Sequence, residues 1–76
     1  MVCFIDFVGT PKGAKIFVDE VEIGELPKYV YPLKWGKYQI RVSLEGYVDE
    51  IRKDYVIFPT DRSKKVVIAL VKSEEA

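Results

Sequence analysis

Apolar and polar residues alternate along several short runs of the chain, and a period of two is typical of half-buried β-strands. The run 38–44 alternates most regularly, and the face expected in the core carries Tyr38, Ile40, Val42 and Leu44. The run 14–19 alternates in the same way, with an inward face at Ala14, Ile16 and Val18. Both runs predict strands with one face in a core and one face in water.

The first run, 2–8, is rich in β-branched and aromatic residues, which favour strands. One of its faces carries Cys3, Ile5 and Phe7, and the other carries Phe4, Asp6 and Val8. Asp6 makes the second face the one expected to meet water. The last run, 64–71, is apolar on both faces from Val66 onward, which predicts a central strand.

Proline and glycine divide the chain about every ten residues, which argues against helices. Three more strands are predicted, at 21–23, 28–33 and 49–58. Asp19-Glu20 is expected to reverse the chain, and Lys34–Lys37 is expected to form a hairpin loop. Pro32 indicates a bulge or an unpaired edge position, and the polar centre of 49–58 indicates a bulge or bend. Short strands at this spacing favour an all-β sandwich or barrel of about 6–7 strands.

The length of 76 residues predicts one domain, placed at 1–72, with a flexible tail at 73–76. Twelve basic and twelve acidic residues cancel, so charge gives no general bias toward nucleic acid or anionic lipid. No apolar run approaches the roughly 20 residues of a membrane span. The chain has no Asn and a single Gln, at Gln39, which favours a thermophilic source. A cytoplasmic protein is expected if Met1 is the native start, and an extracellular or cell-surface one if the chain is a trimmed fragment.

Few residues offer chemistry. Cys3 has no second cysteine to pair with and no histidine to act as its base, so it is predicted to be a small buried residue. The carboxylates at Asp19, Glu20, Glu22 and Glu25 suit a weak Ca²⁺ site or a solvated turn, and the turn is favoured because no glycine-containing ligand loop accompanies them. We therefore predict a non-enzymatic chain with no catalytic residues, no metal and no cofactor.

The best candidate for binding is a group of aromatic residues with interleaved lysines around 29–38. Its members are Tyr29, Tyr31, Lys34, Trp35, Lys37 and Tyr38. Such residues can anchor a protein partner, or stack on sugar rings or nucleic-acid bases. They can equally cover the core, with lysine stems lying over the rings. Because Trp35 lies at the expected loop tip, it is the member of this group that we expect to be exposed.

The first strand suggests a second surface. An unpaired strand edge can bind another strand, and we predict Val2, Phe4, Asp6 and Val8 as a candidate edge for self-association. The favoured function is therefore a structural or protein-interaction module, with a protein partner or a second copy in a homodimer. The alternative is a carbohydrate-binding or nucleic-acid-binding module that uses the Trp35 hairpin.

Five landmarks in order resemble the PEGA domain family, and together they span about residues 10–71. Pro11-Lys12-Gly13-Ala14 resembles the motif that names the family, and the strand after it ends in Asp19. The next three are Gly24-Glu25-Leu26-Pro27, the strand after Gly36, and the Gly46-Tyr47 corner. The last is the closing strand at 66–70. Lys12, Glu20 and Leu26 depart from the family pattern, and the run 2–8 precedes it as an added or swapped strand.

This resemblance implies a small antiparallel β-sandwich with a transthyretin-like or Ig-like outline. It also implies a non-catalytic role, because similar domains are usually repeats or appendages of cell-surface, S-layer and signalling proteins. The family has no shared catalytic residues to transfer to this chain.

Overall fold

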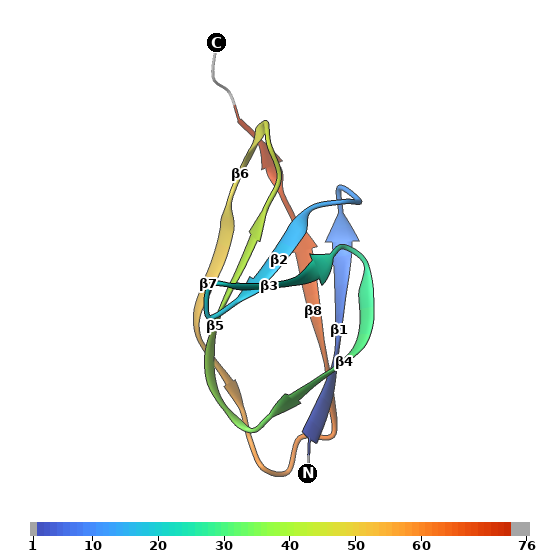
Figure 1. Cartoon of the computed structure of the whole chain (residues 1–76), viewed down its shortest axis with the longest axis vertical. Helices are drawn as coiled ribbons and strands as arrows, with labels where there is room; N and C mark the ends of the chain where they lie inside the picture. The colour runs from blue at the N-terminus through green and yellow to red at the C-terminus, as the bar shows by residue number, and fades with distance from the viewer. Residues whose placement is uncertain (1, 74–76) are drawn as a thin grey trace.

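Two β-sheets face each other across an apolar interior in the computed structural model, which describes residues 2–73 (Figure 1). The three-stranded sheet has the order β4-β1-β8, with β4 at Lys28–Lys34, β1 at Val2–Thr10 and β8 at Ser63–Ala69. The four-stranded sheet has the order β3-β2-β5-β7, with β3 at Val21–Glu25, β2 at Lys15–Val18, β5 at Gly36–Ser43 and β7 at Glu50–Ile57. A small pair, β6 (Tyr47–Val48) and β9 (Val71–Lys72), extends one end. The predicted all-β sandwich is confirmed, with nine described strands in place of six or seven.

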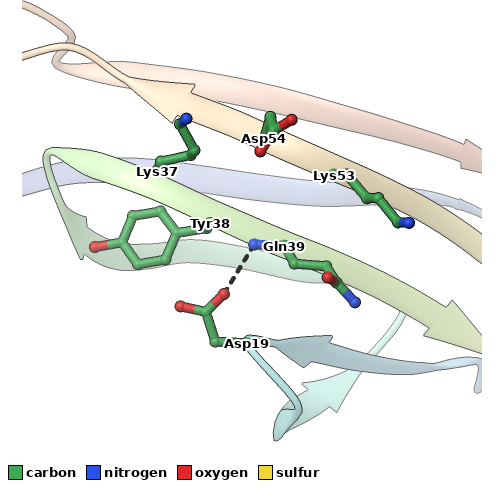
Figure 2. A pocket seen from close by; sticks show the side chains of 6 residues that line it. All are labelled: Asp19, Lys37, Tyr38, Gln39, Lys53 and Asp54. Carbon is green, nitrogen blue, oxygen red and sulfur yellow. Dashed lines mark hydrogen bonds between the residues drawn. The ribbon is translucent and has the colours of Figure 1, made fainter.

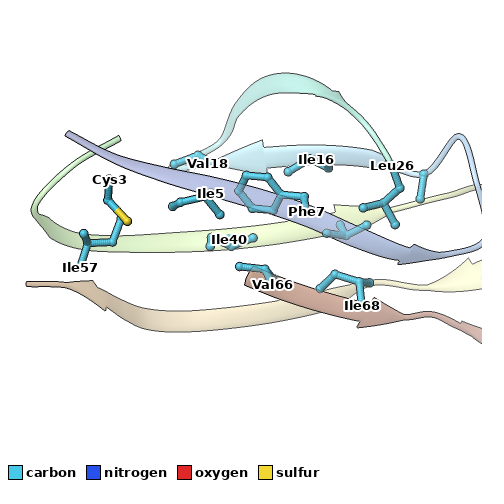
Figure 3. Packing of buried hydrophobic residues seen from close by; sticks show 12 residues of the cluster. Cys3, Ile5, Phe7, Ile16, Val18, Leu26, Ile40, Ile57, Val66 and Ile68 are labelled. Carbon is cyan, nitrogen blue, oxygen red and sulfur yellow. The ribbon is translucent and has the colours of Figure 1, made fainter. Parts of the chain in front are cut away.

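The core includes inward rows that the alternation predicted, in 3–7, 14–18 and 40–42, and adds residues for which no inward face was predicted, Leu26, Ile57, Val66 and Ile68 (Figure 3). Its buried members are Cys3, Ile5, Phe7, Ala14, Ile16, Val18, Leu26, Ile40, Val42, Ile57, Val66 and Ile68. Tyr38 and Leu44 pack against this core and stay partly exposed. Both sheets contribute, so the apolar face of each sheet is removed from water by the other, which is the main stabilising term of a sandwich.

Strand β1 lies in the middle of its sheet. It pairs antiparallel with β4 and parallel with β8, so its backbone is bonded on both sides. The prediction that Val2–Val8 forms an exposed edge is therefore wrong. The prediction that the last strand is central is also wrong, because β8 borders the sheet. Its outward apolar residue, Val67, made β8 resemble a central strand, but that side chain is more than half exposed.

The predicted hairpin at Lys34–Lys37 is not a hairpin. Strand β4 pairs with β1, whereas β5 pairs with β2 and β7, so the chain crosses from one sheet to the other at Trp35. Gly36 has φ +149°, a conformation that side chains rarely adopt, at the point where the direction changes. Gly36 therefore indicated correctly that the chain changes direction here. It did not indicate that the strands on either side belong to different sheets.

Other irregular positions follow the predictions more closely. Asp19 and Glu20 have φ values of 49° and 67° and close the two-residue turn between β2 and β3. The polar centre of 49–58 contains a register shift against β5, with Asp54 at φ 58°. Pro32 lies on the edge strand β4, while the bulge in that strand lies instead at Val30, whose φ is 56°.

The two ends of the described chain lie far apart. The molecule is elongated, with extents of 46 × 20 × 17 Å, and its N- and C-terminal ends lie at opposite ends of the long axis (Figure 1). The backbone N–H of Ser73 donates to the carbonyl of Gly46, so the fold continues one residue into the predicted tail, whose remainder lies outside the described residues. Among residues 2–73, no helix is long and apolar enough to cross a bilayer.

Gly9 sets the separation of β1 and β8. A methyl group at this position would overlap the backbone carbonyl of Ile68, and the φ of Gly9 is +145°. We expect Gly9→Ala to lower the free energy of unfolding by more than about 3 kcal/mol, because backbone atoms of a central ladder cannot move aside cheaply. Chemical denaturation measures the loss.

Gly13→Ala is the matched control. Gly13 also has a positive φ, +90°, but no atom lies within 4 Å of the added methyl group. We expect a loss of about 1 kcal/mol, from backbone strain alone. Equal losses in the two variants would show that β1 and β8 are not in close contact at Gly9.

The single thiol is buried in the core. Cys3 is 1% exposed, and burial, followed by the nearby carboxylate of Asp61, raises the pKa of its thiol. We expect a disulfide reagent such as DTNB to label Cys3 at least about a hundredfold more slowly than the exposed thiol of a Lys12→Cys variant, because both access and the thiolate fraction are low. Complete labelling of both thiols in guanidinium chloride is the control. Equal native rates would contradict the buried position.

Candidate interaction surface

The structure places the six aromatic and lysine candidates in separate locations. Tyr31 points inward from β4 and meets Phe7 edge to face, with ring centroids 6.3 Å apart and planes at 63°. The Nζ atom of Lys28 lies 5.6 Å from the centre of the Tyr31 ring. Tyr31 therefore covers the core, with a lysine side chain over its ring, which is one of the alternatives given for these aromatic residues from the sequence.

Tyr38 and Lys37 line a shallow depression of about 250 Å³ on the other sheet (Figure 2). The other lining residues are Asp19, Gln39, Lys53 and Asp54. The backbone N–H of Gln39 donates to Asp19 Oδ1 at 2.8 Å, so this carboxylate holds the β2–β3 turn against β5. The Tyr38 hydroxyl donates to the carbonyl of Lys34 at 2.8 Å and fixes the crossing between the sheets. These polar contacts have local structural roles.

Trp35 lies at the end of the molecule where the chain crosses between the sheets, and it is 63% exposed. It lines a narrow groove together with Val2, Cys3, Ile57, Phe58, Pro59 and Asp61. Phe58, which is 58% exposed, was not among the predicted residues. Gly36, the first residue of β5, pairs with Ile57, the last residue of β7, so Trp35 just before β5 and Phe58 just after β7 lie next to this end pair. In the sequence, the one indication that Phe58 could be exposed was that this apolar residue stands beside Pro59 in a predicted loop.

The remaining candidates do not join this groove. Tyr29 is exposed on the bulge of β4, next to Val30, and Lys34 is exposed at the end of the same strand. The six residues therefore form no single surface. Of the six, Trp35 is the one that lines this groove, together with the exposed ring of Phe58.

The four residues predicted as a self-association edge form part of a sheet face instead. Val2, Phe4, Asp6 and Val8 alternate with the buried row of β1. Across the parallel ladder, Phe4 pairs with Ser63, Asp6 with Lys65 and Val8 with Val67. We call this surface of β4, β1 and β8 the outward face. Phe4 is 44% exposed and Val67 is 56% exposed, so large apolar side chains lie open to water there.

Asp6 also supports the edge of this sheet. Its Oδ1 atom accepts a hydrogen bond from the backbone N–H of Val30 at 2.9 Å. Val30 is β-branched and has φ 56°, which is an uncommon conformation for such a residue. The Asp6 carboxylate therefore satisfies a backbone donor that the β4 bulge removes from regular pairing.

The outer surface of the four-stranded sheet is different. The guanidinium of Arg41 lies 4.1 Å from the centre of the Phe17 ring and covers it. Arg41 also pairs with Glu20 at 2.9 Å and Asp49 at 3.5 Å, and the hydrogen bond to Glu20 raises the pKa of Arg41. On this surface a charged network covers the central aromatic ring, whereas on the outward face the apolar residues Phe4 and Val67 are uncovered.

The comparisons with known proteins agree with this architecture. The model of the family described as the PEGA domain matches residues 8–73, which is most of the chain. The match includes all of the strands except the first part of β1. No curated protein and no solved structure matches the chain.

Proposed function

The chain belongs to the PEGA domain family, and from that premise we propose that it is a non-catalytic structural and protein-interaction module of an extracellular or surface-associated protein. The family supports this location and gives no support to the cytoplasmic alternative. A thermophilic source and a homodimer remain predictions from the sequence. The observation that carries the interaction role is the uncovered apolar outward face.

The outward face has the properties of a docking surface. Phe4 and Val67 expose apolar area on either side of the Asp6–Lys65 pair, and exposed Val2 extends the Phe4 side toward the Trp35 groove. Large apolar side chains gathered on one exposed face favour an interaction site. The face is more suited to a protein than to nucleic acid, because the basic residue Lys65 pairs across the ladder with the acidic residue Asp6.

We propose a second copy of this chain as the occupant. A two-fold axis in the plane of the interface and parallel to the strands would place Asp6 of each copy near Lys65 of the other, between Phe4 and Val67. With one strand about 30 Å long, two about 23 Å long and a spacing of about 5 Å, each copy would bury roughly 400 Å². The total for the two copies, about 800 Å², is smaller than that of a stable specific complex, so the association is expected to be weak and reversible.

Sedimentation velocity over a wide concentration range tests this proposal. We expect a monomer–dimer equilibrium with a dissociation constant above about 1 µM. Val67→Ser should weaken it about tenfold or more by removing exposed apolar area, and Lys65→Glu should do the same by placing like charges opposite each other. Both positions are exposed, so circular dichroism should show an unchanged fold.

Ile51→Ser is the matched control, because Ile51 is a similarly exposed apolar residue on the outer surface of the other sheet. It should leave the dissociation constant unchanged. A monomer at all concentrations, or an equal effect of Ile51→Ser, would contradict the proposed dimer. A change in Trp35 fluorescence on adding a soluble glycan or a single-stranded oligonucleotide, without dimerisation, would instead favour the ligand-binding alternative.

A further inference from the structure

Strands β1 and β8 connect the two ends of the molecule through a single parallel ladder. The ladder contains seven residue pairs, from Phe4–Ser63 to Thr10–Ala69. Two backbone hydrogen bonds lie at its limits, from Phe4 N–H to the carbonyl of Arg62 and from Leu70 N–H to the carbonyl of Thr10, each 3.0 Å long. The first strand of the described chain is thus bonded along most of its length to the last long strand.

The direction of β1 and β8 relative to the chain ends determines how tension on those ends loads the ladder. Both run the same way along the long axis, so the described chain starts at the lower end of β1 and leaves the upper end of β8 toward β9 (Figure 1). Tension applied to the two ends therefore pulls β1 one way and β8 the other, parallel to the strands. Because bonds between parallel strands are evenly spaced, such a load falls on all of the ladder at once.

Neighbouring contacts hold the ladder in register under this load. Gly9 lets the backbone of β1 approach the Ile68 carbonyl closely. On the other side of β8, Arg52 Nη2 donates to the Val67 carbonyl at 2.7 Å, and Lys64 Nζ donates to the Val56 carbonyl at 3.3 Å. These two side chains connect β8 to β7 of the other sheet. Sliding β8 past β1 therefore requires that these contacts break as well.

We propose that the module bears tension, with the β1–β8 ladder as a shear clamp that resists unfolding when the two ends are pulled apart. This inference rests on the structural role proposed above and specifies that role as resistance to mechanical tension. The clamp lies within one chain, so it does not depend on whether two copies associate. The small β6–β9 pair, with two residue pairs, lies between the C-terminal end and the clamp and should open first, at low force.

Single-molecule force measurement on the Lys12→Cys variant tests the clamp in two pulling directions. One handle is attached at the C-terminal end in both cases. The second handle is attached either at the N-terminal amine, which loads the ladder in shear, or at the thiol of residue 12. Lys12 lies in the turn that follows β1, so pulling there opens the ladder pair by pair from its Thr10–Ala69 end. Buried Cys3 does not compete for the handle.

We expect the main unfolding event to need at least about twofold more force in shear than in the opening direction, at the same loading rate, because forced unfolding depends on the barrier along the pulled direction. Both measurements use one variant, so its stability cancels from the comparison. Equal forces in the two directions, or a lower force from the chain ends, would overturn the clamp. Neither result would alter the sedimentation test of the outward face.

Discussion

The pairing of β1 on both sides is the constraint on which the rest of the structure depends. Because β4 and β8 flank it, β1 has no free edge, and its inward row of Cys3, Ile5 and Phe7 lies at the centre of one wall of the core. The close approach of β8 requires glycine at position 9. The same pairing turns the other row of β1 into a sheet face, and it bonds the first and last long strands to each other in parallel.

The two outer surfaces then have different roles. On the four-stranded sheet, Arg41 covers Phe17 and joins Glu20 to Asp49, and Ile51 beside Arg41 stays exposed. On the three-stranded sheet, Phe4 and Val67 have no such cover. Exposed charge pairs contribute little to stability, so the difference concerns what each surface can bind more than how firmly the domain folds.

The sequence predicted local structure well and long-range pairing poorly. The period of two identified the buried rows at Ile16, Ile40 and Phe7, because burial depends on which face each residue occupies. The same pattern could not show that Val2–Val8 is central, since pairing partners lie far apart in the chain. It also misplaced the last strand, because Val67 is apolar yet exposed.

The aromatic candidates are close in the sequence, but the structure separates them because β4 and β5 belong to different sheets. Phe58 reached Trp35 only through the pairing of Gly36 with Ile57.

Native-state hydrogen exchange, resolved by residue, tests the central position of β1 most directly. If β1 is bonded on both sides, its amides from Ile5 to Val8 should exchange only through global unfolding and be among the slowest in the chain. Amides of the short pair β6–β9 should exchange much faster, through local opening. Fast exchange along β1, with slow exchange retained in β2 and β5, would contradict this structure and would show that the first strand is an addition to a fold that is complete without it.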